Sequence, residues 1–418
     1  MEFRLSVTFL FRPPRNSGDF NAIGSLMDAR SLRSVVSQQL IHRSNLRLQM
    51  RPLLFVLLLL SAVLNLAVYF AYVQSSLGHN DFRLYYAGAE VGLRYGWSHI
   101  YDVNLHQAAV AALQSGGPWY PLLTPAPITW VVAPLTVLGY PAAYWVWVLL
   151  SLAILGAALF YVRPRQLSAA LYLMWWAALG PVWFSAYEGQ ITIVAAAALL
   201  IGWRLLETRR DFLGGAILAL ALFKPYLVLL LPIALLVSGR WRALLGFSVV
   251  AVAAGVGMLA TLHLDGTEKY LATLLAPQAV GDTARSLGSV LGHSPAVFAI
   301  QAVVVIAVIA VAVHARRTHA AWPILVSALL GSFLLATYWH PQDYIALDAA
   351  AAIMLAAGPL RAALVMATAV AVLSGLVNPL NSHQIAQGWL LFALVFLGFL
   401  GFKALKRSEP QPTAMQLA

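Results

Sequence analysis

The sequence predicts an all-α, polytopic integral membrane protein, and three observations support this prediction. Apolar residues make up 61% of the 418 positions and charged residues only 10%, whereas soluble domains carry about 25% charged residues. The mean hydropathy is +0.79. Apolar runs near the length of a membrane-crossing helix, about 20 residues, recur along the chain. Such a composition leaves no room for a large soluble domain.

The charge balance is strongly basic, with 26 Lys and Arg against 15 Asp and Glu. The cations lie between apolar runs and at the chain ends, so they indicate topology and contacts with membrane lipids, and we expect no nucleic-acid partner. The absence of cysteine excludes disulfides, thiolate metal sites and a cysteine nucleophile. The sequence also lacks a glycine-rich ATP-binding loop and the His-Glu-x-x-His zinc motif, so we expect neither an ATP-driven pump nor a bound metal.

Residues 1 to 51 form a polar, basic tail that we expect to remain in the cytoplasm. A basic amphipathic helix over residues 30 to 51 on the inner leaflet fits this composition, and so does a disordered leader with Met27 or Met50 as the true start. The first apolar run, Pro52 to Gln74, begins too late to be a cleaved signal peptide, so it predicts a retained helix that leads to the outer side.

Ser75 to Tyr120 is the longest polar stretch between apolar runs, and we expect it outside the membrane. Within it, Phe82 to Tyr95 and Val103 to Gln114 have the spacing of two short surface helices. A transmembrane domain over 52–406 with about twelve crossings would follow, and a cytoplasmic tail over 407–418 would end the chain. The further apolar runs are 126–138, 142–162, 168–186, 190–206, 212–238, 243–262, 296–314, 321–338, 344–359, 362–377 and 388–404.

The apolar run 212–237 lies between two arginine clusters, at 204–210 and 240–242, that both favour the cytoplasmic side. Lys224-Pro225 interrupts this run, and proline disfavours a continuous helix there. We therefore predict a hairpin of two short helices. The parity of the crossings then requires that one run within 126–162 is not a full crossing.

Ionisable groups near membrane depth are costly, so each is a candidate for function. Asp81 follows the first apolar run by a few residues and opens the sequence Asp81-Phe82-Arg83-Leu84-Tyr85-Tyr86. Its carboxylate is suitably placed to act as a general base on a substrate hydroxyl. Asp is also a favoured helix N-cap, so Asp81 could instead cap the helix that begins at Phe82, and the two roles are compatible.

Three cations are candidates for binding an anionic group. Lys224 lies at the helix break, where broken membrane helices bind anions, although its side chain could instead extend to the interface. His340, close to Asp343 and Tyr344, could stabilise a leaving phosphate or belong to an interfacial aromatic belt. Arg285 could clamp a phosphate or be an ordinary solvated arginine of a loop.

Four passages, taken together and in this order, resemble glycosyltransferase family 87 of the GT-C superfamily, which includes polyprenol-phosphate-dependent mannosyltransferases. The resemblance extends from about Pro52 to Lys406. The chain departs from the family pattern in its long N-terminal tail and at His340-Pro341. The passages are Asp81-Phe82-Arg83-Leu84-Tyr85-Tyr86; Thr124-Pro125-Ala126-Pro127 with Ala133-Pro134-Leu135; Gly189-Gln190; and Gly214-Gly215 through Lys224-Pro225-Tyr226 to Arg240-Trp241-Arg242.

The resemblance implies a GT-C-like helical bundle in the plasma (inner) membrane, with the active site on the extracytoplasmic side. It implies an inverting transferase that moves a hexose, with mannose expected, from a polyprenyl monophosphate to a lipid or glycan acceptor. No cofactor is expected, because the lipid-linked sugar is itself the activated substrate. Asp81 matches the family's catalytic acid, and Lys224, Arg285, His340 and Arg83 would contact the donor phosphate.

Further residues are candidates for contact with the substrates. Tyr85 and Tyr86 are suited to stacking on sugar rings, although an interfacial aromatic belt is an equal alternative. The other candidates for substrate contact are the polar residues Glu188, Gln190 and Asp343 and a third tyrosine, Tyr344.

Two other functions stay open. A non-catalytic lipid or small-solute membrane transporter would also use a carboxylate and a lysine near the bilayer to bind its solute. A polysaccharide polymerase usually has paired arginines in a long outer loop, and here only Arg285 occurs in the comparable loop.

Overall fold

The computed structural model describes residues 29–113, 119–165, 167–276, 286–292, 294–375 and 382–406. Two units make up the chain, residues Met1–Leu57 and Leu58–Ala418, and helix α2 (Ala29–Ser76) contains the boundary. Residues 30 to 51 are helical, as part of α2. The second unit carries the other described helices, and its described residues contain no strand. The fold class predicted from the sequence, an all-helical membrane protein, is confirmed.

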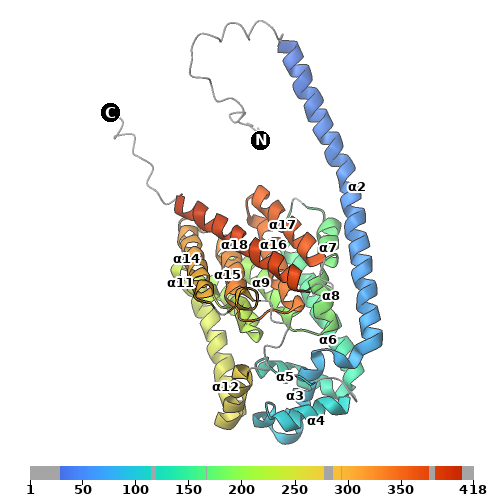
Figure 1. The fold of residues 1–418 in the computed structure, drawn as a ribbon, viewed down its shortest axis with the longest axis vertical. Coiled ribbons are helices and arrows are strands. Elements are labelled where there is room, and N and C mark those ends of the chain that lie inside the picture. The colour runs from blue at the N-terminus through green and yellow to red at the C-terminus, as the bar shows by residue number, and fades with distance from the viewer. Residues whose placement is uncertain are drawn as a thin grey trace, which may run out of the picture. The chain divides into compact units, whose positions relative to one another are not determined.

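The second unit continues from α2 as a series of helices that differ widely in length (Figure 1). In chain order they are η1 (Leu77–His79), α3 (Phe82–Tyr95), η2 (Trp97–His99), α4 (Val103–Leu113), α5 (Pro127–Val132), η3 (Ala133–Leu138), α6 (Tyr140–Val162), α7 (Ala169–Ala177), α8 (Gly180–Tyr187), α9 (Thr192–Glu207), α10 (Asp211–Leu218), η4 (Ala219–Phe223), η5 (Pro225–Val228), α11 (Leu231–Val237), α12 (Trp241–Leu275), α13 (Leu287–Leu291), α14 (Pro295–Thr318), α15 (Trp322–Leu335), η7 (Pro341–Tyr344), α16 (Ile345–Ala357), α17 (Leu360–Gly375) and α18 (Ser382–Lys406).

The number of long apolar helices corrects the expectation of about twelve crossings. In the described part of the chain, five helices are long and apolar enough to cross a membrane, or six if α7 and α8, bent by 58°, count as one span. Several predicted runs instead form shorter apolar helices, because prolines and tight turns interrupt them. The five are Pro52–Ser75, Tyr140–Val162, Trp241–Leu275, Pro295–Thr318 and Gln384–Lys406.

Two details of the predicted topology are confirmed. The two short helices predicted within Ser75 to Tyr120 exist as α3 and α4, and α3 has the predicted bounds. The run 126–138 is not a full-length crossing, because α5 and η3 are short and proline occupies the first turn of each. The adjacent helix α6 is long enough to cross.

The predicted hairpin at 212–237 is also confirmed. The chain runs through α10 and η4, breaks at Lys224 (φ −131°, ψ 82°), and returns through η5 and α11. Both ends of the hairpin meet, since the Arg240 guanidinium forms an ion pair with Asp211 at 2.7 Å. Lys224 therefore lies at the tip of the hairpin.

Glycines allow the helices of this region to cross closely. A Cβ at Gly215 would overlap the carbonyl of Ala243, and one at Gly246 would overlap the carbonyl of Phe212. A Cβ at Gly202 would lie 2.5 Å from the Leu218 side chain. The backbones of α10 and α12 thus touch directly, which gives the Gly214-Gly215 pair a packing role.

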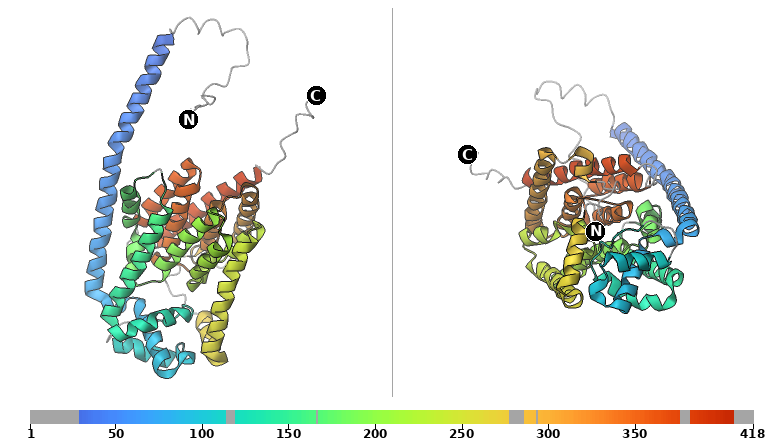
Figure 2. Two further views of the ribbon diagram at one scale, coloured as in Figure 1. Left: turned by 180° about the vertical axis from the view of Figure 1, so that it is seen from behind. Right: turned by 60° about the horizontal axis from the view of Figure 1, so that its bottom comes forward.

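The helices α3, α4 and α5 form a layer at one end of the second unit (Figure 2). This layer packs against the C-terminal half of α12, where the rings of Tyr101 and Tyr270 lie 4.6 Å apart. The layer also contacts α6, where the ring centroids of Phe82 and Trp147 lie 5.8 Å apart, and the turn between α8 and α9. Helix α9 then runs away from the layer for 16 residues, about 24 Å at the usual helical rise. The two ends of α9 therefore define two opposite ends of the bundle.

Candidate active site

Asp81 joins the start of α3 to the turn between α8 and α9. The residue occupies the N-cap position of α3, but its side chain makes no capping hydrogen bond. Its carboxylate Oδ2 instead accepts a hydrogen bond from Nε2 of Gln190. The backbone N–H of Asp81 donates to Oε2 of Glu188 at 3.0 Å. The Asp81 carboxylate is therefore held by Gln190, a residue outside α3, and it does not cap the helix that Asp81 precedes.

The turn Glu188–Gln190 is fixed by groups on both sides. Gly189 has a left-handed backbone (φ 60°), and a Cβ there would lie 2.6 Å from Cβ of Phe82, so only glycine fits. The indole N–H of Trp147 on α6 donates to the carbonyl of Gly189 at 2.7 Å. The backbone N–H of Phe82 donates to the carbonyl of Glu188 at 2.9 Å. The turn is thus clamped between α3 and α6.

Tyr85 sets the orientation of the Gln190 amide. Its hydroxyl donates to Oε1 of Gln190 at 2.8 Å, which leaves the amide N–H₂ directed at Asp81. Tyr85 is 2% exposed, and burial together with the negative charge of Asp81 raises its pKa, so it remains a hydrogen-bond donor at neutral pH. The chain from Tyr85 through Gln190 to Asp81 therefore presents one defined face of the carboxylate.

Glu188 lies beside Asp81 and has a perturbed acidity. Burial raises the pKa of Glu188 well above its ordinary value, and the negative charge of Asp81 raises it further. The N–H of Asp81 and the charges of Arg83 and Lys224 oppose this rise. Two neighbouring carboxyl groups with unequal surroundings are typical of catalytic sites, where one stays charged and the other retains its proton.

A second cluster surrounds Asp343 at the tip of the hairpin. Nζ of Lys224 lies 2.8 Å from Oδ1 of Asp343, and the two side chains are 8% and 0% exposed. The Tyr226 hydroxyl and the His340 backbone N–H donate to Oδ2 of Asp343 at 3.0 and 2.9 Å. Such a buried ion pair persists only with further hydrogen bonds of this kind. The cluster therefore fixes the position of Lys224 firmly.

The two clusters lie near each other. The Ser185 hydroxyl on α8 donates to the carbonyl of Gln342 at 3.0 Å, which joins the end of α8 to η7. Lys224 lowers the pKa of Glu188 through its charge, and Asp343 raises that of Tyr85. The structure thus brings Asp81, Glu188, Lys224 and Asp343, which are far apart in the sequence, into one electrostatic environment.

The remaining predicted residues lie in different surroundings. The His340 side chain accepts a hydrogen bond from the backbone N–H of Asp343, and Arg83 is 1% exposed. The Tyr86 hydroxyl donates to the carbonyl of Thr136, and Tyr344 stacks on Trp389 at 5.5 Å, so both tyrosines pack inside the protein. Arg285 lies outside the described residues.

One residue of the site was missed by the sequence analysis. Tyr226 follows Lys224-Pro225 directly and donates to the same carboxylate that pairs with Lys224. Its position beside a charged residue at a helix break was the available signal, because an aromatic hydroxyl there can satisfy a buried charge.

The family model described as Glycosyltransferase family 87 matches residues 123–341 of this chain, which is more than half of its length. The chain belongs to glycosyltransferase family 87. This family membership confirms the resemblance noted in the sequence and implies a glycosyltransferase. The matched part contains Gln190, Lys224 and His340 of this family 87 protein. Neither a curated protein nor a solved structure matches the chain.

Proposed function

We propose that this family 87 protein moves a hexose, with mannose as the first candidate, from a polyprenyl monophosphate to a hydroxyl group of a lipid or glycan acceptor. The observation that supports this most directly is the Asp81 carboxylate, which Gln190 holds. The pair of Lys224 and Asp343 is close enough for its charges to act on Glu188 and Tyr85, which are the neighbours of Asp81 and Gln190. A positioned carboxylate and a nearby cation are the two groups that such a transfer requires.

In the proposed reaction Asp81 takes the proton of the acceptor hydroxyl. The hydroxyl oxygen forms a bond to the anomeric carbon from the face opposite the phosphate, and the bond between that carbon and the phosphate oxygen breaks. The electron pair leaves with the polyprenyl phosphate, so the configuration at the anomeric carbon inverts. Gln190 and Tyr85 would orient the base, and a base of this kind contributes roughly 10²- to 10⁴-fold.

Lys224 is the first candidate to compensate the charge of the departing phosphate. Its ammonium group has three N–H donors, and Asp343 accepts one hydrogen bond from it. Arg83, His340 and Arg285 are the further candidates for this role. The substrate-contacting positions remain Tyr85, Tyr86, Glu188, Gln190, Asp343 and Tyr344, of which Tyr85, Glu188 and Gln190 lie next to Asp81.

We also propose that the Asp81 end of the bundle faces the extracytoplasmic side of the plasma membrane. The opposite end of α9 adjoins Arg209 and Arg210, and Arg240 and Arg242 lie there with Arg316 at the end of α14. An excess of arginine at one end of membrane helices favours the cytoplasm.

The test is transfer of radiolabelled mannose from polyprenyl phosphate to an acceptor lipid extract by the purified protein in liposomes. We expect Asp81→Asn to lower the transfer rate by at least about 100-fold. Asp265→Asn is the matched control, because Asp265 is 65% exposed and forms an ion pair with its helical neighbour Lys269. Equal rates in wild type and Asp81→Asn would refute the role of Asp81. Labelled donor that crosses the bilayer unchanged would favour the transporter.

A further inference from the structure

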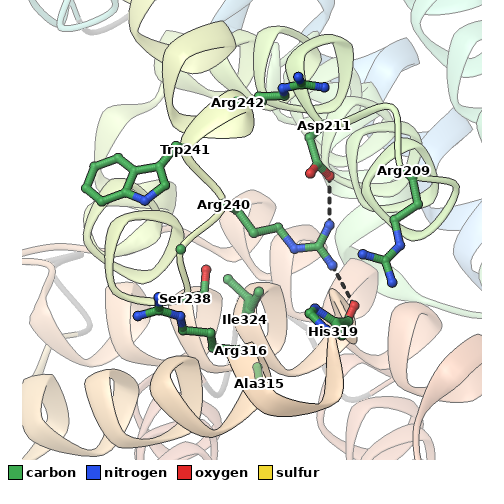
Figure 3. Close-up of a pocket in the computed structure, with 11 residues that line it drawn as sticks. Arg209, Asp211, Ser238, Arg240, Trp241, Arg242, Ala315, Arg316, His319 and Ile324 are labelled. Atoms are coloured by element: carbon green, nitrogen blue, oxygen red, sulfur yellow. Dashed lines mark hydrogen bonds and ion pairs between the residues drawn. The ribbon is translucent and has the colours of Figure 1, made fainter.

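A cavity of about 420 Å³ lies at the end of the bundle away from Asp81. Three helix-to-helix connections meet there, those between α9 and α10, between α11 and α12, and between α14 and α15 (Figure 3). We call it the arginine pocket. It is lined by Arg209, Asp211, Ser238, Gly239, Arg240, Trp241, Arg242, Ala315, Arg316, His319 and Ile324.

Arg240 fixes the frame of the arginine pocket. Its guanidinium donates to Oδ1 of Asp211 at 2.7 Å, to the carbonyl of Leu206 at 3.0 Å and to the carbonyl of His319 at 2.7 Å. Figure 3 shows this side chain extending across the pocket between Arg209 on one side and Arg316 on the other. Arg240 thus joins the three connections, and its own guanidinium already has three hydrogen-bond acceptors within the protein.

The other arginines leave the pocket with excess positive charge. Arg209, Arg242 and Arg316 line it, and among the described residues no ion pair involves any of them. Asp211 is the sole acidic residue of the lining and is paired with Arg240. The N-terminus of α12 also opens here without a side-chain cap, which adds a favourable potential for an anion.

Arg209 has an unfavourable backbone for its residue type. Its φ is +62°, in the left-handed region, and the corresponding residue before α12 is Gly239 with φ +74°. A glycine would adopt this conformation more easily than an arginine. Strained backbone that carries a charged side chain into a cavity is a feature of ligand-binding sites.

We propose that the arginine pocket binds a phosphate group, either that of an anionic lipid headgroup or that of a soluble phosphate compound. Arg316 stands in the last turn of α14, an apolar helix long enough to cross the membrane, so the pocket opens at the depth of lipid headgroups. Basic pockets between membrane helices recognise headgroups of this kind, and arginine binds phosphate oxygens bidentately. The pocket is separate from the site at Asp81, so the proposal does not depend on the proposed transfer reaction.

The experiment measures lipid binding by native mass spectrometry of the full chain, titrated with phosphatidylglycerol or with phosphatidylcholine. We expect wild type to prefer phosphatidylglycerol, and the double variant Arg209→Gln/Arg316→Gln to bind it on the order of 30-fold more weakly, since each arginine at a membrane surface contributes about fivefold. Arg317→Gln is the matched control, because Arg317 neighbours Arg316 on the same helix but does not line the pocket. An equal loss in the control would overturn the proposal, and so would a wild type that shows neither a preference for phosphatidylglycerol here nor stabilisation by phosphate in the second measurement.

A second measurement separates the two sources of phosphate. Thermal unfolding is followed in phosphatidylcholine nanodiscs with inorganic phosphate or with chloride at equal ionic strength. Stabilisation by phosphate that the double variant lacks identifies a soluble phosphate compound as a ligand, whereas stabilisation only by added phosphatidylglycerol identifies a headgroup. Either result supports the site, and an unfolding midpoint that responds to neither ligand refutes it.

Arg209→Gly separates binding from folding. A merely structural arginine would make this variant less stable without ligand. We expect instead that it unfolds at the same or a higher temperature in phosphatidylcholine, because glycine relieves the backbone strain, while its preference for phosphatidylglycerol falls by about fivefold.

Discussion

The side-chain amide of Gln190 donates a hydrogen bond to the Asp81 carboxylate, although 109 residues separate the two positions. The Tyr85 hydroxyl fixes the orientation of this amide from the other side. The arrangement links the start of α3 to the start of α9, a buried helix of the bundle. It makes Gln190 a positioning residue for the proposed base.

Replacement of Gln190 should therefore impair catalysis more than folding. We expect Gln190→Leu to lower kcat by about tenfold to 100-fold, because Asp81 loses the donor that orients it. Tyr85→Phe should lower kcat by less than about tenfold, since it removes one hydrogen bond to the orienting residue. Steady-state kinetics of mannose transfer measures both, and a Gln190→Leu rate equal to wild type contradicts the positioning role.

Gly189→Ala should disrupt the site by steric overlap. The new Cβ would lie 2.6 Å from that of Phe82, in a backbone with φ +60°. Gly139→Ala is the matched control. Gly139 also has a positive φ (72°), but a Cβ added there would have no atom within 4 Å. We expect the control to lose about 1 kcal/mol and Gly189→Ala to lose more, together with transfer activity. Thermal unfolding and the transfer assay test this, and equal losses in the two variants would contradict it.

The buried pair of Lys224 and Asp343 should show strong coupling. Asp343→Asn or Lys224→Met alone leaves one buried charge without its partner, at a cost of about 3 to 5 kcal/mol. We expect the double variant to be more stable than either single variant yet inactive, because the proposed phosphate-binding cation is gone. A double-mutant cycle of unfolding free energies measures the coupling, and strictly additive effects would contradict it.

His106 on α4 should make the stability of the layer formed by α3, α4 and α5 depend on pH. Its Nε2 lies 3.0 Å from the carbonyl of Leu84, and Trp119 donates to its Nδ1. Burial lowers the pKa of His106 from 6.5 to about 4. As the pH falls, the unfolded chain binds a proton at this histidine before the folded protein does. The contribution of His106 to the free energy of unfolding is therefore fully present above pH 6.5. It decreases by about 3 kcal/mol in total as the pH falls to the folded-state pKa.

The matched variants for this prediction are His106→Gln and His99→Gln. Glutamine offers one donor and one acceptor as neutral imidazole does, so we expect His106→Gln to lose most of the destabilisation between pH 6.5 and 5. His99→Gln, in the same layer, should retain the wild-type dependence. Unfolding midpoints at several pH values decide, and an unchanged dependence in His106→Gln contradicts the assignment.

Much of the local structure could be predicted from the sequence. The bounds of the helix Phe82–Tyr95 follow from its spacing of apolar and polar residues, and the break at Lys224-Pro225 follows from the missing N–H of proline. The number of helices long enough to cross a membrane could not be predicted in this way. An apolar run such as 321–338 gives no indication that its helix ends at Leu335. Apolar composition alone does not distinguish a crossing helix from a shorter buried one.

The sequence by itself determined the membrane class, the breaks in the helices and which residue types are able to do chemistry. Only the tertiary structure decided which of them meet, as with Lys224 and Asp343, which are 119 positions apart. The physical reason is that composition and proline act locally, whereas a hydrogen bond between distant side chains depends on how the helices pack. Close packing at glycines such as Gly189 and Gly215 places Asp81 at one end of the bundle and the arginines of the pocket at the other.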